Sequence, residues 1–244
     1  MNDMQPKIVL IQARNPDDVM ARHEQKCFAK KLELEESQVE VRNLLQSPVN
    51  IDDLKKFPAV FLGGSGNYYA SKGDLPGFEP YLDVLRELCE IGHPTLGVCY
   101  GFHCLARAQG AKVIQDTERT EVGTYTMRLT EAGTQDPLLG SLPSSFNAQM
   151  GHKDHVLAPP ENCHNLVESD LSPNQAFRVG NKPIWAVQFH PELDMDTNKD
   201  RFIHYLEGYG GNMSEEEREK QLSAFQPSPA ASTVLKAFLD LVLQ

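Results

Sequence analysis

The chain has 244 residues and a net charge of −11, from 23 basic and 34 acidic side chains. It contains neither a basic stripe nor interleaved aromatic and basic residues, so we expect no nucleic-acid partner. No apolar run approaches the ~20 residues that span a bilayer, and the N-terminal MNDMQPK lacks an apolar signal region. We therefore expect a cytoplasmic protein with no membrane partner. The five cysteines include no C-x-x-C pair and resemble neither a disulfide framework nor a zinc site.

Strand and helix patterns alternate over the first quarter of the chain. Strands are predicted at residues 7–13, 39–43 and 59–62, and helices over a segment ending near 34 and over 51–57. Asp17 or Asp18 is the expected N-cap of the first helix. The β-α-β-α-β order predicts a parallel, doubly wound sheet with right-handed crossovers and flanking helices.

A glycine-rich segment, Gly63-Gly64-Ser65-Gly66, follows the third predicted strand, and a helix is predicted over 78–91. The C-terminal ends of parallel strands are where such sheets bind ligands. The segment lacks the third glycine of a dinucleotide fingerprint and is not followed by Gly-Lys-Ser/Thr, so we reject a nucleotide site. A turn with positive φ is one interpretation. Beside the motif described next, backbone N–H groups aimed at an oxyanion are the interpretation that we favour.

The stretch 94–110, PTLGVCYGFHCLARAQG, predicts a buried strand at 95–98, a tight turn at Cys99, and a helix from about Phe102 to a C-cap at Gly110. Glycines two positions before and after Cys99 give the nucleophile-elbow pattern with sulfur in place of oxygen. The helix N-terminus favours the thiolate, so Cys99 is a candidate nucleophile. The alternative is a buried cysteine acting as a small hydrophobe, which is what we expect of the others: Cys27, Cys89, Cys104 and Cys163.

The pattern changes to short, turn-separated strands from Glu121 onward. These strands are predicted at 121–129, 145–150, 166–169, 175–179 and 184–189. They indicate a small antiparallel layer added to the parallel core.

The last of these strands leads into His190-Pro191-Glu192. Residues two apart on a strand face the same side, so His190 and Glu192 can lie together. A carboxylate beside an imidazole fixes its tautomer and stabilises its charged form, as in a catalytic triad. The alternative for an isolated His-x-Glu is a solvated strand end.

The C-terminal part reads as a helix over 194–208, a polar excursion over 210–229, and an amphipathic helix over 230–243. Ser214 to Glu217 forms a capping box that begins a short charged helix in the excursion. We expect a single domain over 1–244, with 210–244 as a helical extension packed on it.

Four motifs in this order resemble the class I (triad-type) glutamine amidotransferases: GGSG at 63–66, GVCYG at 97–101, MGHKDHV at 150–156 and AVQFHPE at 186–192. The resemblance covers about residues 7–208 and is strongest to stand-alone proteins related to the amidotransferase domain of GMP synthetase. It implies a flavodoxin-like α/β fold and an enzyme that needs no metal or organic cofactor.

The resemblance also implies a role for individual residues. Cys99 would be the nucleophile, His190 the base and Glu192 its orienting carboxylate, with an oxyanion hole from the N–H groups of Gly64 and Tyr100. His152 and His155 would be the next candidates for the base. The implied substrate-binding residues are Gly63, His103, Met150, Gly151, His152 and Lys153. The implied reaction is attack of Cys99 on the γ-amide of glutamine, release of ammonia, and hydrolysis of a glutamyl thioester.

Two positions depart from the family pattern. His103 stands where a glutamine usually helps to hold the substrate, and Lys153 stands where glycine is common. Three functions remain open: an amidotransferase subunit that passes ammonia to a partner synthetase, a stand-alone hydrolase of γ-glutamyl peptides or conjugates, and a non-catalytic binding module. The chain lacks the ATP-pyrophosphatase part of a fused GMP synthetase, so an ammonia acceptor would be a separate subunit.

Overall fold

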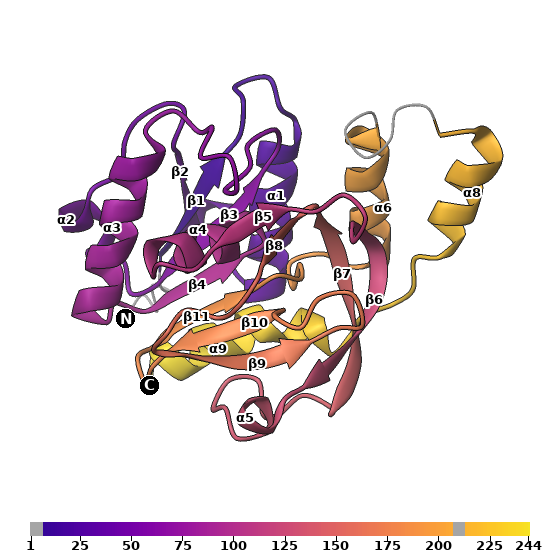
Figure 1. Ribbon diagram of the computed structural model, residues 1–244. Helices are drawn as coiled ribbons and strands as arrows, with labels where there is room; N and C mark the ends of the chain where they lie inside the picture. Colours follow the sequence, from indigo (N-terminus) through magenta and orange to yellow (C-terminus); the bar gives the residue numbers. More distant parts are fainter. Residues whose placement is uncertain (1–6, 207–212) are drawn as a thin grey trace.

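The computed structural model describes residues 7–206 and 213–244, and a nine-stranded sheet runs through this part of the chain in the order β2-β1-β3-β4-β11-β10-β9-β6-β7 (Figure 1). The strands are β1 Ile8–Ala13, β2 Val39–Asn43, β3 Val60–Ser65, β4 Thr95–Val98, β6 Glu121–Leu129, β7 Ser145–His152, β9 Cys163–Glu168, β10 Ala176–Val179 and β11 Ile184–Val187. The first five in spatial order are parallel, and the other four pair antiparallel. The predicted mainly parallel α/β fold is confirmed.

Helices flank this sheet. They are α1 Met20–Leu32, α2 Ile51–Leu54, α3 Phe78–Ile91, α4 Tyr100–Ala108, α5 Glu131–Thr134, α6 Met195–His204, α8 Glu215–Ser223 and α9 Val234–Val242, with short 3-10 turns η1 Glu36–Gln38 and η2 Ala231–Thr233. None of these helices is long and apolar enough to cross a bilayer.

Alternate residues of the parallel strands feed two separate cores. Ile8 and Leu10 of β1 belong to a cluster with α1 and α9, whereas Val9 and Ile11 belong to a cluster with α3 and α4. Successive side chains of a strand point to opposite faces, so a strand that is covered on both faces must be apolar throughout. The unbroken apolar run in the sequence is the direct consequence.

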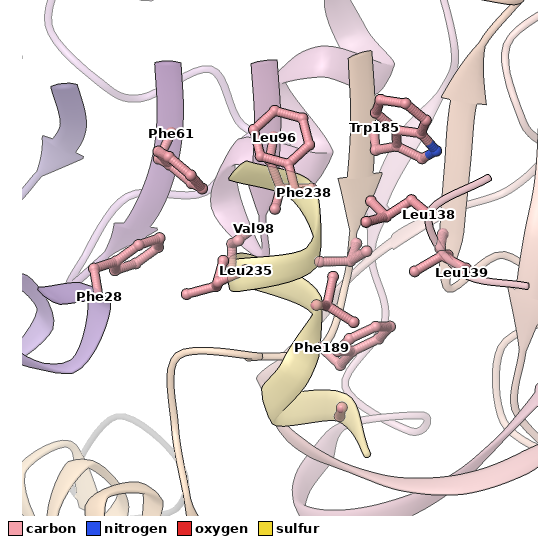
Figure 2. Close-up of a cluster of buried hydrophobic side chains, with 14 of the residues drawn as sticks. Phe28, Phe61, Leu96, Val98, Leu138, Leu139, Trp185, Phe189, Leu235 and Phe238 are labelled. Carbon is pink, nitrogen blue, oxygen red and sulfur yellow. The ribbon is translucent and has the colours of Figure 1, made fainter. Parts of the chain in front are cut away.

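The C-terminal helix α9 covers one face of the sheet. Its Phe238 ring lies 5.4 Å from the ring of Phe61 on β3 and 5.9 Å from that of Trp185 on β11 (Figure 2). Burying one such ring contributes about 1.5–3 kcal/mol. The helix therefore joins the middle of the sheet, although it lies more than 40 residues after β11 in sequence.

The antiparallel strands continue the central sheet, while a separate two-stranded sheet forms from β5 (Val113–Gln115) and β8 (Asp154–Val156). Neither of these two strands was predicted, because three residues are too few to show an alternating pattern.

Two predicted helix starts differ from the structure. The N-cap of α1 is Val19 and makes no side-chain capping bond, although the Asp18 carboxylate accepts the N–H of Met20 at 2.9 Å. Asp17 and Asp18 are therefore not the cap that was predicted. Helix α4 begins at Tyr100, two residues before the predicted start, and Gly110 after it has the expected positive φ of 85°.

The predicted helix over 194–208 begins as expected, with Asp194 as N-cap, and ends at His204; residues 207 and 208 lie outside the described part. The predicted capping box of α8 is present, with Ser214 Oγ accepting the Glu217 N–H at 3.2 Å. No residue of α8 is buried, and this helix stands at the edge of the molecule (Figure 1).

Candidate active site

Cys99 alone makes the turn from strand β4 to helix α4. Its φ of 51° and ψ of −98° are rare for a residue with a side chain, and its N–H donates to Val187 O at 2.9 Å. A Cβ at position 97 would lie 2.8 Å from Gly101 O, and one at position 101 would lie 2.4 Å from Leu62 O. Only glycine fits at either position, so the strand-turn-helix geometry expected from the sequence is present.

The Cys99 thiol lies at the wall of a pocket of about 450 Å³, a volume within the range of small-molecule sites. Only 9% of the residue is exposed, and Sγ is 3.9 Å from Gly151 O. Tyr100 is the first residue of α4, so its N–H has no acceptor within the helix. This N–H and the helix dipole favour negative charge beside the sulfur.

His190 and Glu192 lie together as predicted, directly after β11. His190 Nδ1 is 2.7 Å from Glu192 Oε1, and the His190 N–H donates to Gln149 O at 2.9 Å, which fixes the backbone. Burial disfavours protonation of His190, but the Glu192 carboxylate and the neighbouring Cys99 sulfur outweigh it and raise the pKa of His190 to about 9. Burial likewise opposes ionisation of Glu192, yet His190 and Arg201 lower the pKa of its carboxyl.

Arg201 on α6 is a member of this group that sequence reasoning missed. Its Nη1 donates to Glu192 Oε1 at 3.0 Å and lies 3.2 Å from His190 Nδ1. A signal was available, because polar Asn198 and Arg201 are spaced three apart on a helix and occupy its buried face with Phe202.

Four of the predicted substrate-binding residues line the pocket: His103, Gly151, His152 and Lys153. The other two, Gly63 and Met150, are not among the residues that line it. Gly63 is buried outside the pocket lining, and a Cβ at this position would meet Leu10 and Glu24. Met150 does not line the pocket either, because its side chain is fully buried in the core cluster beneath α9.

His103 lies in the pocket wall, and a hydrogen bond to Gln188 fixes its ring. Its Nε2 is 2.6 Å from Gln188 Oε1, and only 3% of the residue is exposed. Burial, together with the neighbouring His152, lowers the pKa of His103 to about 3, so the ring is neutral.

The Gly64 N–H, predicted as an oxyanion donor, has another acceptor in the structure. It donates to Oε1 of Glu24 at 2.8 Å, and the same carboxylate accepts from Arg14 and Gln12. Burial would raise the pKa of Glu24, but Arg14 and Arg201 hold it down at about 2. In this arrangement the Gly64 N–H is therefore not available to an oxyanion. A sequence signal existed, since Glu24 interrupts the apolar face of α1.

The two other candidate bases are placed less favourably than His190. His152 has both ring nitrogens engaged, Nδ1 with Asp154 O at 2.8 Å and Nε2 with Glu121 Oε2 at 2.9 Å. His155 does not line the pocket. Within residues 7–206 and 213–244, no group of three or more His, Cys, Asp or Glu side chains could hold a metal ion.

Sequence comparison identifies relatives among the glutamine-hydrolyzing GMP synthases. A family model described as glutamine amidotransferase class-I matches residues 24–205. A glutamine-hydrolyzing GMP synthase subunit from Sulfolobus acidocaldarius is 31% identical over 144 residues, which cover 59% of this chain and 72% of that protein. The glutamine-hydrolyzing GMP synthase of Aquifex aeolicus is 30% identical over 146 residues, but the match covers only 26% of its length.

Solved structures with the same fold are more distant in sequence. A glutamine amidotransferase from Thermotoga maritima superimposes with a TM-score of 0.72 at 16% identity, covering 98% of this chain and 100% of that one. A glutamine amidotransferase from Methylobacillus flagellatus gives 0.69 at 17% identity, covering 98% and 94%. These likenesses show the fold, and the family match over residues 24–205 shows the kinship: the chain belongs to the class-I glutamine amidotransferases.

Proposed function

We propose that this chain hydrolyses the γ-carboxamide of glutamine through a glutamyl thioester on Cys99. The observation that carries the proposal is the grouping of Cys99, His190 and Glu192, in which a strained elbow holds a thiol beside an imidazole that is bonded to a buried carboxylate at 2.7 Å. A nucleophile and a base in one pocket wall, with an orienting carboxylate bonded to the base, are what covalent acyl transfer requires.

The proposed steps follow from the charges of the site. The raised pKa of His190 favours an imidazolium beside a Cys99 thiolate. The thiolate attacks the γ-carbonyl carbon, and the oxyanion of the tetrahedral intermediate accepts a hydrogen bond from the Tyr100 N–H. As the carbon–nitrogen bond breaks, His190 gives its proton to the departing ammonia. His190 then takes a proton from water as the water oxygen attacks the thioester carbon; the carbon–sulfur bond breaks, glutamate is released, and the Cys99 thiolate and the His190 imidazolium are restored.

A second oxyanion donor requires a local rearrangement in this proposal. The Gly64 N–H can donate to the oxyanion only after its hydrogen bond to Glu24 is broken. Until then, Tyr100 supplies the donor at the helix N-terminus.

A second candidate function is hydrolysis of a γ-glutamyl compound with a leaving group larger than ammonia. At the ~30 Å³ that liquid water occupies per heavy atom, the ten heavy atoms of glutamine would take at most roughly 300 Å³. The pocket of about 450 Å³ is larger and reaches beyond Cys99 to Asp18 and Tyr205. Rates on glutamine and on γ-glutamyl dipeptides, measured side by side, separate the two candidates.

The relatives suggest a partner for the released ammonia. The Sulfolobus relative and one from Methanocaldococcus jannaschii are each described as one subunit of a glutamine-hydrolyzing GMP synthase. We propose that ammonia from this chain passes to a separate synthetase subunit. A rise in glutaminase rate on adding cell extract supports such a partner, and an unchanged rate supports a free-standing hydrolase.

The experiment that tests the proposed function compares Cys99→Ala with Cys163→Ala. Cys163 is half-buried and lies outside the pocket, so its substitution removes a thiol without touching the site. We expect the unmodified protein and Cys163→Ala to release glutamate at equal rates, and Cys99→Ala to release none while melting at a similar temperature. Turnover by Cys99→Ala would contradict the nucleophile assignment.

A further inference from the structure

Arg201 is buried against the catalytic group that we propose, although it lies outside the four motifs at 63–66, 97–101, 150–156 and 186–192. It lies in α6, whose start is fixed by the Asp194 capping box, and only 4% of the residue is exposed. Its Nη1 is 3.0 Å from Glu192 Oε1 and 3.2 Å from His190 Nδ1. A single guanidinium nitrogen therefore touches two of the three proposed catalytic side chains.

The geometry selects one tautomer of His190. Arginine stays protonated and offers only donors, so Nη1 cannot accept a proton from Nδ1. If Nδ1 were unprotonated, its lone pair would face the Glu192 carboxylate oxygen at 2.7 Å, and two hydrogen-bond acceptors would repel each other. The stable arrangement has Nδ1–H and Nη1–H both donating to Oε1, which leaves Nε2 as the nitrogen that exchanges a proton with Cys99.

Arg201 is poorly explained as a stabilising residue. Its Nε and Nη2 and the Glu192 Oε2 are buried and have no hydrogen-bond partner among the described residues. A buried ion pair with unsatisfied atoms is generally no more stabilising than apolar side chains of the same shape. Its presence is better explained by what it does to His190 and Glu192.

We propose that Arg201 is a positioning residue for the thiol chemistry: it keeps Glu192 ionised and holds Oε1 on Nδ1 of His190, so that Nε2 faces the sulfur. This inference rests on the proposed function of Cys99, His190 and Glu192. It extends the proposed triad by a fourth, charged member, which lines the same pocket as Cys99 and His190.

The other charges around Arg201 determine what its removal does. The titratable groups that interact with it or with its two partners are Arg14 after β1, His23, Glu24 and Cys27 on α1, and Cys99 before α4. Glu24 is neutralised chiefly by Arg14, with Arg201 adding to it, whereas Glu192 depends on His190 and Arg201, so loss of Arg201 removes one of the two cations that keep Glu192 ionised. Both Glu192 and His190 then bind protons more tightly, and the pH profile moves to higher pH.

The test compares Arg201→Met with Arg201→Lys in the full chain, with Arg178→Met as the control. Arg178 is a partly buried arginine whose guanidinium stacks on Trp185 at 4.5 Å, outside the pocket. We expect Arg201→Met to lower kcat by about 10²-fold, because Glu192 and His190 lose the guanidinium that positions them. The acidic limb of kcat/KM should move up by about one pH unit, whereas Arg201→Lys should keep that limb and lose several-fold in kcat.

An NMR readout separates positioning from packing. The Nδ1–H proton of His190 should resonate far downfield in the unmodified protein and in Arg178→Met, and should shift upfield or vanish in Arg201→Met. An unchanged resonance and pH profile, with only a lower melting temperature, would overturn the proposal. If Arg201→Met does not fold, Arg201→Lys decides: an unchanged kcat overturns it. Turnover by Cys99→Ala would instead show that the proposed function has failed.

Discussion

Two histidines line the same pocket with the same burial, but one ring is charged and the other is neutral. His190 and His103 are each 3% exposed, yet the pKa of His190 is raised to about 9 and that of His103 is lowered to about 3. The difference lies in the partner: His190 faces a carboxylate and a thiol, whereas His103 faces the amide of Gln188 and another histidine. Burial determines how strongly a partner shifts the pKa of a histidine, and the charge of the partner determines the direction of that shift.

One short segment supplies both partners. Gln188, His190 and Glu192 follow β11 directly, and the first of them holds His103 while the other two form the charged pair. The residues after β11 thus support two walls of the pocket: a neutral wall at His103, held by Gln188, and a charged wall at His190, held by Glu192. The neutral wall suits substrate contact, and the charged wall suits proton transfer.

The largest expected difference between the two walls is in turnover. His190→Asn should lower kcat by about 10⁴-fold or more, because the members of a triad act as a unit. His103→Asn, with the same change of side chain, should stay within about tenfold, since that ring carries no proton in the reaction. Steady-state kinetics at neutral pH decides. Equal losses from both substitutions would contradict the assignment of His190 as the base.

Glu192→Gln should fall between these two. The amide still fills the space beside Nδ1, but it loses the charge that favours the imidazolium, so we expect a loss of kcat roughly 10²-fold smaller than that of His190→Asn. Gln188→Glu is the matched change on the neutral wall. It should raise the pKa of His103, which NMR titration of the ring can follow, without restoring activity to Glu192→Gln.

The stability of the protein should depend on pH in opposite directions for the two rings. The raised pKa of His190 stabilises the fold below about 6.5, and this is lost as pH rises to about 9; the contribution is about 3 kcal/mol. The lowered pKa of His103 does the reverse, and its contribution is lost as pH falls from about 6.5 toward 3. The comparison of urea unfolding across pH in His190→Asn and His103→Gln isolates each slope. Parallel curves for both variants and the unmodified protein would contradict these charge states.

The smallest effect is expected at the substrate-facing side of His103. A glutamine there restores the family residue, so His103→Gln should raise kcat/KM for glutamine by about tenfold, or about 1.4 kcal/mol. The same substitution should change kcat/KM for a γ-glutamyl dipeptide much less. If the unmodified protein hydrolyses glutamine efficiently and the substitution alters nothing, His103 is a packing residue held by Gln188.

The sequence indicated the fold and the proposed catalytic side chains, because both follow from local patterns. Unbroken apolar runs predicted the parallel strands, and paired glycines around Cys99 predicted the elbow. Contacts between distant segments do not follow from local patterns: a polar residue on the buried face of a helix marks Glu24 and Arg201, but it does not say which residues they contact. Glu24, which takes the Gly64 N–H, lies 40 residues before it, and Arg201 belongs to a helix that follows the proposed triad.

The sequence also did not predict which residues of the strands at 60–65 and 145–152 face the pocket. The family pattern assigns Gly63 and Met150 to the substrate, but strand alternation turns Met150 into the core and Gly63 toward Leu10 and Glu24. One residue along each strand, Gly64 and Gly151 do line the pocket. Which of two adjacent residues faces a site depends on strand register and twist, which a motif does not specify.

The central claim is that Cys99 carries the acyl group, and the mass of the quenched enzyme tests it most directly. The protein is mixed with glutamine or a γ-glutamyl dipeptide, quenched in acid, and digested with trypsin. The tryptic peptide 87–107 contains Cys89, Cys99 and Cys104, so fragmentation must locate the added mass. We predict a gain of one glutamyl group on Cys99 and none on the other two, and no gain in Cys99→Ala. Turnover without any adduct on Cys99, or an adduct that persists in Cys99→Ala, would contradict the account.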